Sequence, residues 1–376
     1  MKKKLSLITL QYINNYGSVL QTYASQMYFE NKGLLVETVN YTRENCRFQN
    51  LKKSMRAYYK QKNRIFRIPF VSDMLVLRWN ILYRIRNKVF EKFRGIKIKL
   101  SNEYFTSQDL MCSPPEADYY CVGSDQVWNY LYNDGVLPEY FLQYAPVEAK
   151  RFSFSSSLGL EKVEEEANCA LIKQYLDNFS LVTVRENSAK KALEEIGVER
   201  CHQILDPTLL ISKEEWISEL GLKLDCQEKY VLVYQLNPCA EMDNFAREIA
   251  TKHNYKLIII SNNIRLSVPG AKIIRNPTVE RFLELILNAQ YVVTDSFHGT
   301  AFSLNFNRQI FSWMPGKYST RLMSVLELLG LQERAFTKNE KRWEKLPDID
   351  YDSVNNVLVN ERKRAAMLIE EVFNDD

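Results

Sequence analysis

Short apolar segments alternate with amphipathic ones along most of the chain. Residues 5–10 (LSLITL) predict a buried strand, which a polar turn separates from a helix running from Ser18 to about Asn31. Strand and helix then recur in two series, with a break near residues 212–229. Further strands are predicted at 34–41, 117–125, 151–157, 181–186, 230–236, 256–261, 291–296 and 309–313. Apolar strands that are each followed by a helix predict parallel sheets buried on both faces.

The two series predict an α/β protein with two Rossmann-like domains facing one cleft. We expect the first domain to span 1–211 and the second 212–376, with the last helix crossing back to the first domain. The length of 376 residues agrees, because a domain usually holds about 100–200 residues. A hydrophobic content of 46% supplies two cores and excludes a disordered chain. No apolar run approaches the roughly 20 residues that span a bilayer.

The N-terminal sequence and the cysteines favour a cytoplasmic protein. The basic start leads into an apolar run without a small-residue cleavage site, so we interpret it as a strand and not as a signal peptide. The seven cysteines are scattered and form no CxxC pair, which argues against a disulfide framework and a cysteine zinc site. With three histidines and no clustered carboxylates, we predict no metal site.

The net charge of +4 hides a strongly basic segment at residues 51–100, which predicts a helical excursion from the first domain. It holds fifteen Lys/Arg and two acidic residues, so the rest of the chain sums to −9. One interpretation is that its apolar face packs on the domain while the basic side chains are solvated. The other is peripheral contact with the inner face of an anionic membrane or with a polyprenyl phosphate. No nucleic-acid module accompanies the charge, so we expect no nucleic-acid partner.

Unusual residues follow the predicted strands, where ligands of open parallel sheets collect. After the first strand, Asn15 and Gly17 form a turn that opens a helix whose free N–H groups suit an anion. After the strands near 117–122 and 151–154, small and polar residues suit the approach of a ligand, although helix capping is the alternative. These residues are Gly123, Ser124, Asp125, Gln126, Trp128, Ser155 and Ser156.

Three charged or titratable residues stand at later strand ends. Arg185 can bind a phosphate or carboxylate bidentately, or form a salt bridge with a neighbouring acid. Asp206 can orient a base or cap a turn. His298, with Ser296 before it and Gly299 after it, lies at a strand-to-helix junction, where an imidazole can act as an acid or base beside an anion. A packed structural histidine is the alternative.

The ordered set of segments NNYGSVLQTYA, GSDQVWN, SFSSSLG, VREN, LDPTLL and TDSFHGTAFSLNF resembles the polysaccharide pyruvyl transferase family, from about residue 9 to 331. The resemblance implies a fold like the two-domain GT-B glycosyltransferases. It also implies transfer of a pyruvyl group from phosphoenolpyruvate, as co-substrate, to a sugar of a polysaccharide or its lipid-linked precursor, forming a pyruvate ketal without another cofactor.

The resemblance also assigns roles to residues. Arg185 matches the arginine expected to hold the donor's anionic groups, and His298 matches the general acid/base. Many members have Arg at the position of Ser296, a departure for which Arg321 can compensate. Asp125 or Asp206 would accept a proton or orient the imidazole. The full expected donor site is Arg185, Arg321, Ser296, Gly299, Asn15 and Gly17.

Two alternative functions share the fold. A GT-B glycosyltransferase would use a sugar nucleotide as donor in the same cleft. A non-catalytic member of the fold would need neither His298 nor Arg185.

Overall fold

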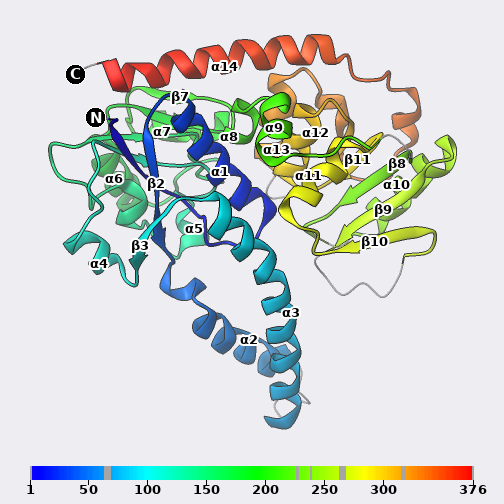
Figure 1. Ribbon diagram of the computed structural model, residues 1–376, viewed down its shortest axis with the longest axis horizontal. Coiled ribbons are helices and arrows are strands. Elements are labelled where there is room, and N and C mark those ends of the chain that lie inside the picture. The colour runs from blue at the N-terminus through cyan, green and yellow to red at the C-terminus, as the bar shows by residue number, and fades with distance from the viewer. Residues whose placement is uncertain are drawn as a thin grey trace.

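Two parallel β-sheets, each flanked by helices, lie side by side in the computed structural model (Figure 1). The structure describes residues 2–62, 69–225, 228–237, 239–261, 268–314 and 319–374. The predicted α/β class and parallel sheets are confirmed. Residues 63–68 of the basic segment lie outside the described residues.

The first sheet has the strand order β3-β2-β1-β4-β5, and every pairing is parallel. Its strands are β1 (Lys4–Ile8), β2 (Leu35–Tyr41), β3 (Leu100–Tyr104), β4 (Tyr119–Val122) and β5 (Lys150–Ser153). A parallel bridge from Phe152 to Leu181 continues it toward the pair β6 (Val182–Val184) and β7 (Cys201–Gln203). All of β4 is buried, as expected for a strand covered on both faces.

The helices of this half connect successive strands or line their ends. They are α1 (Tyr16–Asn31), α4 (Ser107–Cys112), α5 (Tyr130–Asn133), α6 (Glu166–Leu176), α7 (Asn187–Glu195), α8 (Pro207–Leu210) and α9 (Lys213–Leu220). Side-chain caps define several of their starts: Asn15 caps α1 and Asp206 caps α8. Each cap satisfies a backbone N–H that the helix leaves unpaired.

The second sheet has the order β10-β9-β8-β11-β12-β13 and is also parallel. Its strands are β8 (Tyr230–Tyr234), β9 (Lys256–Ser261), β10 (Ala271–Arg275), β11 (Tyr291–Thr294), β12 (Gln309–Trp313) and β13 (Ala335–Phe336). Its helices are α10 (Ala240–His253), α11 (Val279–Leu287), α12 (Phe297–Asn305) and α13 (Ser319–Leu328). In both sheets the order reverses beside the first strand of the series, where such folds bind ligands.

Helix α1 joins the two halves, because its side chains pack into the core of the second. The ring of Tyr16 stacks on Phe282 with centroids 4.2 Å apart, and its hydroxyl donates a hydrogen bond to the carbonyl of Pro277 at 2.7 Å. Tyr23 packs against Trp216 of α9. Helix α1 therefore fixes the first turn of one half against the other.

The last helix, α14 (Tyr351–Asn374), runs across both halves (Figure 1). Near its end, Phe373 packs edge-on against Tyr119 of β4, with centroids 4.9 Å apart. In its middle, the Arg362 guanidinium donates to the carbonyl of Leu209 and to the side chain of Asn305, 3.0 Å away. Helix α14 thus holds elements of both sheets together.

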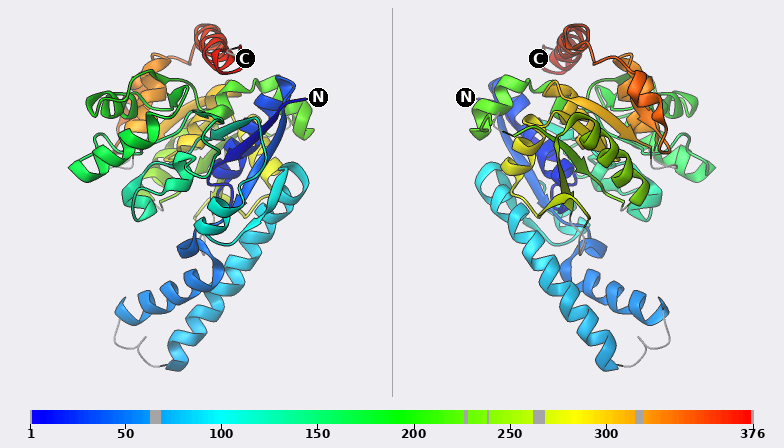
Figure 2. Two further views of the ribbon diagram at one scale, coloured as in Figure 1. Left: turned by 90° about the vertical axis from the view of Figure 1, so that its left-hand side faces the viewer. Right: turned by 90° about the vertical axis from the view of Figure 1, so that its right-hand side faces the viewer.

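Helices α2 (Phe48–Lys62) and α3 (Pro69–Lys97) form an arm that projects from the body (Figure 2). Phe48 of α2 packs against Trp79 and Tyr83 of α3. At the base of the arm, Phe90 is buried against Tyr16 of α1. Among the described residues, no helix has both the length and the apolar character needed to cross a membrane.

Candidate functional site

A small cleft of about 210 Å³ lies between the two halves, at the carboxyl ends of β1, β4 and β11. Residues 10–18, 125–132, 236–237, 295–298 and 321–322 contribute to its wall. Its polar lining consists of Asn15, Ser18, Asp125, Gln126, Tyr132, Asn237, Asp295, Ser296, His298 and Arg321. Both halves are therefore needed to form it.

His298 lies in the first turn of α12, behind the capping residue Ser296, whose hydroxyl accepts from the Gly299 N–H. Its imidazole lies directly against Gly17 of α1: a Cβ at Gly17 would be 2.0 Å from Nδ1. Its Nε2 faces the Asp206 carboxylate at 3.8 Å and finds no hydrogen-bond partner among the described residues. Because Gly17 has no side chain, the imidazole fits between the two halves of the molecule.

The Asp206 carboxylate is fully enclosed behind His298 and organises the residues around it. Its Oδ2 accepts hydrogen bonds from Arg185 and from the Ser124 hydroxyl, both at 2.9 Å. Its Oδ1 accepts from the backbone N–H and the hydroxyl of Thr208. Burial alone would raise the pKa of this carboxyl, but the positive charges of His298 and Arg185 and the Thr208 hydrogen bonds lower it. Asp206 is thus held as an anion facing the imidazole.

Arg185 is buried and does not line the cleft. Its Nη1 pairs with Asp206, its Nε lies 3.6 Å from Glu186, and its guanidinium stacks over the Phe297 ring at 4.3 Å. Burial lowers the pKa of this guanidinium, but the surrounding carboxylates outweigh burial and raise it. In this geometry Arg185 pairs with Asp206 outside the lining of the cleft, and its direct contact with the donor stays a prediction.

Asp125 reaches the cleft from the carboxyl end of β4. Its backbone is left-handed, with φ of +76°, a conformation that Asp tolerates better than most residues. The Ser18 hydroxyl donates to its carboxylate at 2.6 Å. Burial would raise its pKa, but Arg185, His298 and the Ser18 hydrogen bond lower it. A second carboxylate therefore borders the space beside His298.

Burial lowers the pKa of the His298 imidazole below its usual value. Asp206 opposes this shift, and the positive charge of Arg185 adds to it. The lowered pKa favours the neutral imidazole at pH 7, the form that can accept a proton. Within the part of the chain that the structure describes, no three His, Cys, Asp or Glu residues are grouped to hold a metal ion.

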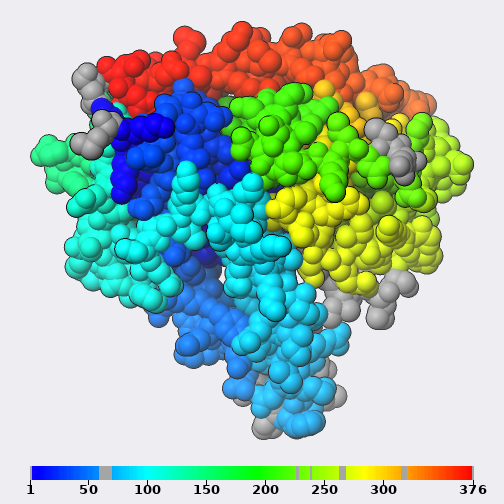
Figure 3. All heavy atoms as spheres, viewed as in Figure 1, coloured from blue at the N-terminus to red at the C-terminus, as the bar shows by residue number. Residues whose placement is uncertain are grey.

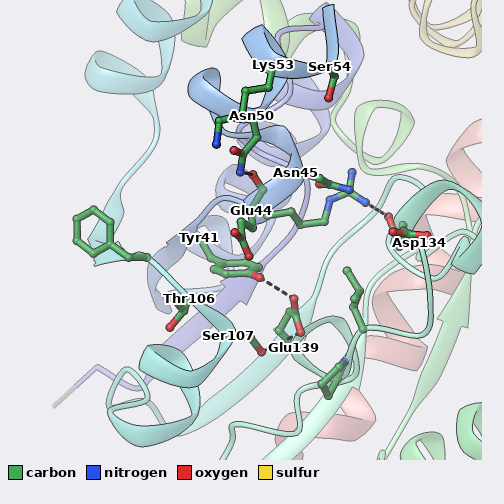
Figure 4. A pocket seen from close by; sticks show the side chains of 15 residues that line it. Tyr41, Glu44, Asn45, Asn50, Lys53, Ser54, Thr106, Ser107, Asp134 and Glu139 are labelled. Carbon is green, nitrogen blue, oxygen red and sulfur yellow. Dashed lines mark hydrogen bonds between the residues drawn. The ribbon is translucent and has the colours of Figure 1, made fainter. Parts of the chain in front are cut away.

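A second cavity, of about 690 Å³, lies between the start of the arm and the loop after α5 (Figure 4). On its floor, Tyr41 donates a hydrogen bond to the buried Glu139 carboxylate at 2.8 Å. Asn50, Lys53 and Ser54 of α2 form its other side. We call it the arm-base cavity.

Two contacting residues, Arg43 and Tyr132, lie between the two cavities. Arg43 lines the arm-base cavity and stacks over the ring of Tyr132, 5.0 Å from its centroid. Tyr132 in turn lines the cleft beside Asp125 and Gln126.

The sequence matches the family model of polysaccharide pyruvyl transferases over residues 15–312, which is most of the chain and includes His298 and Arg185. The chain belongs to the polysaccharide pyruvyl transferase family. No curated protein matches it by sequence.

Solved structures with the same architecture include UDP-N-acetylglucosamine 2-epimerases. The Neisseria meningitidis enzyme, solved bound to UDP-GlcNAc, aligns with a TM-score of 0.53 at 10% identity, covering 99% of this chain and 100% of that one. The Rickettsia bellii enzyme aligns with a TM-score of 0.50 at 11% identity, covering 99% and 96%. At this identity the likeness shows the fold alone, and it confirms the GT-B-like architecture expected of the family.

Several residues that the family motifs singled out are placed away from the cleft. Trp128 belongs to the core: its ring stacks on Phe141 and its indole N–H donates to the Tyr140 carbonyl. Ser124, Ser155 and Ser156 are fully buried, and Gly123 packs against β1. None of these five lines the cleft; of the residues predicted to contact the acceptor or to line the cleft, only Gln126 does so.

Four polar cleft residues were not singled out from the sequence: Ser18, Tyr132, Asn237 and Asp295. Ser18 and Asp295 make the contacts that organise the cleft. Ser18 holds Asp125, and Asp295 accepts hydrogen bonds from the backbone of Leu236 and Asn237, which ties the end of β8 to that of β11. Each is a direct neighbour of a residue that was singled out, Gly17 or Ser296. The available signal was that Ser18 and Asp295 lie within the family segments NNYGSVLQTYA and TDSFHGTAFSLNF.

Replacement of Gly17 by alanine is expected to destabilise the protein by about 1–3 kcal/mol, because the new methyl group would overlap the His298 ring. The free energy of unfolding in urea measures this effect. Gly95→Ala is the control, since a Cβ there meets no atom within 4 Å; it should leave stability unchanged or raise it. Equal unfolding midpoints for Gly17→Ala and the wild type would contradict the close contact.

Proposed function

We propose that this protein transfers a pyruvyl group from phosphoenolpyruvate to two hydroxyls of a sugar, in a polysaccharide or its lipid-linked precursor, and forms a cyclic ketal. The observation that carries the proposal is the buried His298 imidazole, which faces the Asp206 carboxylate at 3.8 Å and borders a cleft also lined by Arg321.

The small cleft suits a compact anionic donor. Its volume of about 210 Å³ is below the roughly 300–1,000 Å³ typical of sites for drug-sized ligands, which disfavours a whole nucleotide sugar. Phosphoenolpyruvate carries a phosphate and a carboxylate. Arg321 supplies a guanidinium, and the first turn of α12 supplies a positive helix end beside Ser296. Asn15 adds an amide at the opposite wall.

In the proposed reaction one sugar hydroxyl adds to C2 of phosphoenolpyruvate, and the C3 methylene takes up a proton to become a methyl group. The second hydroxyl then displaces phosphate at C2. Two C–O bonds form while the C2–C3 π bond and the C2–O bond to phosphate break. One hydroxyl proton ends on C3, and the other leaves with inorganic phosphate.

His298 is proposed to carry the proton in the first of these steps. Asp206 faces Nε2 and favours the tautomer protonated there, which leaves Nδ1 to accept the hydroxyl proton and pass it to C3. Asp206 then stabilises the imidazolium that forms, without touching substrate. Asp125 borders the same space and can hold the attacking hydroxyl.

We place the sugar acceptor in the arm-base cavity. It is the larger of the two, and the contacting side chains of Arg43 and Tyr132 lie between it and the cleft. The Glu139 carboxylate, Tyr41 hydroxyl and Asn50 amide offer the acceptors and donors that sugar hydroxyls need (Figure 4). Phe105 adds an aromatic ring to the lining.

The test is to incubate the protein with phosphoenolpyruvate and a panel of lipid-linked and free oligosaccharides, and to measure phosphate release and the mass of the product. We expect both to require acceptor. Arg321→Lys should weaken donor binding about tenfold or more, because lysine lacks the bidentate fork. The matched control is Arg281→Lys, an exposed residue of α11. Binding and turnover of a nucleotide sugar, with no response to phosphoenolpyruvate, would overturn the proposal in favour of a glycosyltransferase.

A further inference from the structure

An uncovered apolar stripe runs along the outer part of the arm helix α3. Phe70, Met74, Leu77, Ile81 and Ile85 have side chains between 50% and 78% exposed. Their spacing of three and four residues places them on one helix face, over about 22 Å of its length. We call this set the α3 stripe.

The α3 stripe faces away from the helix that packs on α3. Trp79 and Tyr83 make the aromatic contacts with Phe48 of α2, so they occupy a different face of α3 from the stripe. The arm extends well beyond the body of the protein (Figure 3). Nothing among the described residues covers the stripe, and monomeric proteins rarely leave a contiguous apolar surface of this kind exposed without use.

Basic side chains accompany the stripe. Arg78, Arg84, Lys88 and Lys92 are exposed on the same helix and, by helical spacing, lie within or beside the stripe. The two acidic residues of α3 are Asp73, which pairs with Arg56, and Glu91, which accepts a hydrogen bond from Asn87. The surface is thus apolar and strongly positive.

We propose that the α3 stripe and its basic neighbours form a docking surface for an anionic lipid bilayer. The apolar side chains would enter the boundary between headgroups and acyl chains, and the Arg and Lys side chains would contact lipid phosphates. Charge complementarity favours this occupant over a second copy of the chain, because residues 51–100 carry a net charge of +13 and two such arms repel each other.

The proposal goes beyond the transfer reaction and does not depend on it. It also explains why the arm-base cavity opens beside α2, through Asn50 and Lys53: an acceptor carried by a lipid would reach it from the bilayer on which the arm lies.

The experiment is vesicle co-sedimentation of the full chain, with vesicles of phosphatidylcholine alone or of an equal mixture with phosphatidylglycerol. We expect binding to the anionic vesicles only, weakening as salt rises. Leu77→Ser with Ile81→Ser, and separately Lys88→Glu with Lys92→Glu, should each reduce this binding about tenfold or more. Because all four positions are exposed, the variants should keep the wild-type melting temperature.

Two control variants change matched residues away from the arm. Val359→Ser with Met367→Ser alters exposed apolar positions of α14, and Lys341→Glu with Lys345→Glu reverses two exposed charges. Both should bind anionic vesicles as the wild type does. Equal binding to both vesicle types, or unchanged binding by the stripe and charge variants, would overturn the proposal. So would a dimer in sedimentation that the Leu77→Ser, Ile81→Ser variant abolishes, with no vesicle binding, which would assign the stripe to a second copy.

Discussion

Replacement of His298 by glutamine is expected to lower turnover by about two to four orders of magnitude, the usual contribution of a positioned acid/base. Glutamine can fill the space beside Gly17 and donate a hydrogen bond, but it cannot carry a proton between two substrate atoms. Donor affinity should change far less, because the proposed anion binding rests on Arg321 and the start of α12, which line the same cleft. Steady-state kinetics and donor titration measure the two effects separately.

The dependence of kcat/KM on pH is a second measurement of the role proposed for His298. Because burial lowers the pKa of His298 below 6.5, wild-type kcat/KM should fall on the acid side only below about pH 6.5. The residual activity of His298→Gln should lack this acid limb. His253→Gln, at the end of α10, is the control and should match the wild type. A glutamine variant with near wild-type turnover would show that His298 only positions the substrate.

Replacement of Asp206 by asparagine is expected to destabilise the protein by about 3–5 kcal/mol at pH 7, since it leaves the buried Arg185 guanidinium without its closest counter-charge. Asparagine keeps the shape of the side chain, so the loss of stability measures the effect of removing the charge and not that of creating a cavity. Urea unfolding measures the difference from the wild type. Asp350→Asn is the control, because Asp350 caps an exposed helix start and asparagine caps equally well.

The Asp206 effect should also depend on pH. The folded-state pKa of Asp206 lies below its ordinary value of 3.8, so its stabilising contribution is complete above about pH 4 and is lost as pH falls through the folded pKa. The difference between wild type and Asp206→Asn should therefore shrink in strongly acidic urea titrations. The double variant Asp206→Asn, Arg185→Met should recover part of the stability, because it removes the unpaired charge. An Asp206→Asn variant as stable as the wild type would contradict the role given to the pair.

The architecture could be predicted from the sequence because apolar strands such as 5–10 and 230–236 are each followed by an amphipathic helix. His298 was found for a local reason: it stands directly after a strand and in a motif of the family. The contacts that could not be predicted join side chains that are far apart in the sequence and close in space. Arg185 and Asp206 are 21 residues apart, and nothing in the segments VREN and LDPTLL shows that their side chains meet behind the imidazole.

Trp128 was predicted from the sequence to line the site, but it lies in the core. Its place after GSDQ at a strand end suggests a ligand, but the chain turns at the left-handed Asp125 and sends the indole into the core against Phe141. A strand end in the sequence does not reveal which way the following loop turns. The arm-base cavity was missed because Tyr41, Glu139 and Asn50 come from three separate segments.

The packing of α1 has a consequence for how the molecule unfolds. Tyr16 and Tyr23 belong by sequence to the first half, but they complete the apolar core of the second, while Phe297 and Ala301 of α12 lie in the core cluster of the first. Neither half keeps an intact core by itself. The two sheets should therefore unfold as a single cooperative unit. In hydrogen exchange, the most protected backbone amides of both sheets should become exposed together. Each half would reach its final packing only against the other. The site at their boundary would form only after the side chains of α1 and α12 have packed into the opposite cores.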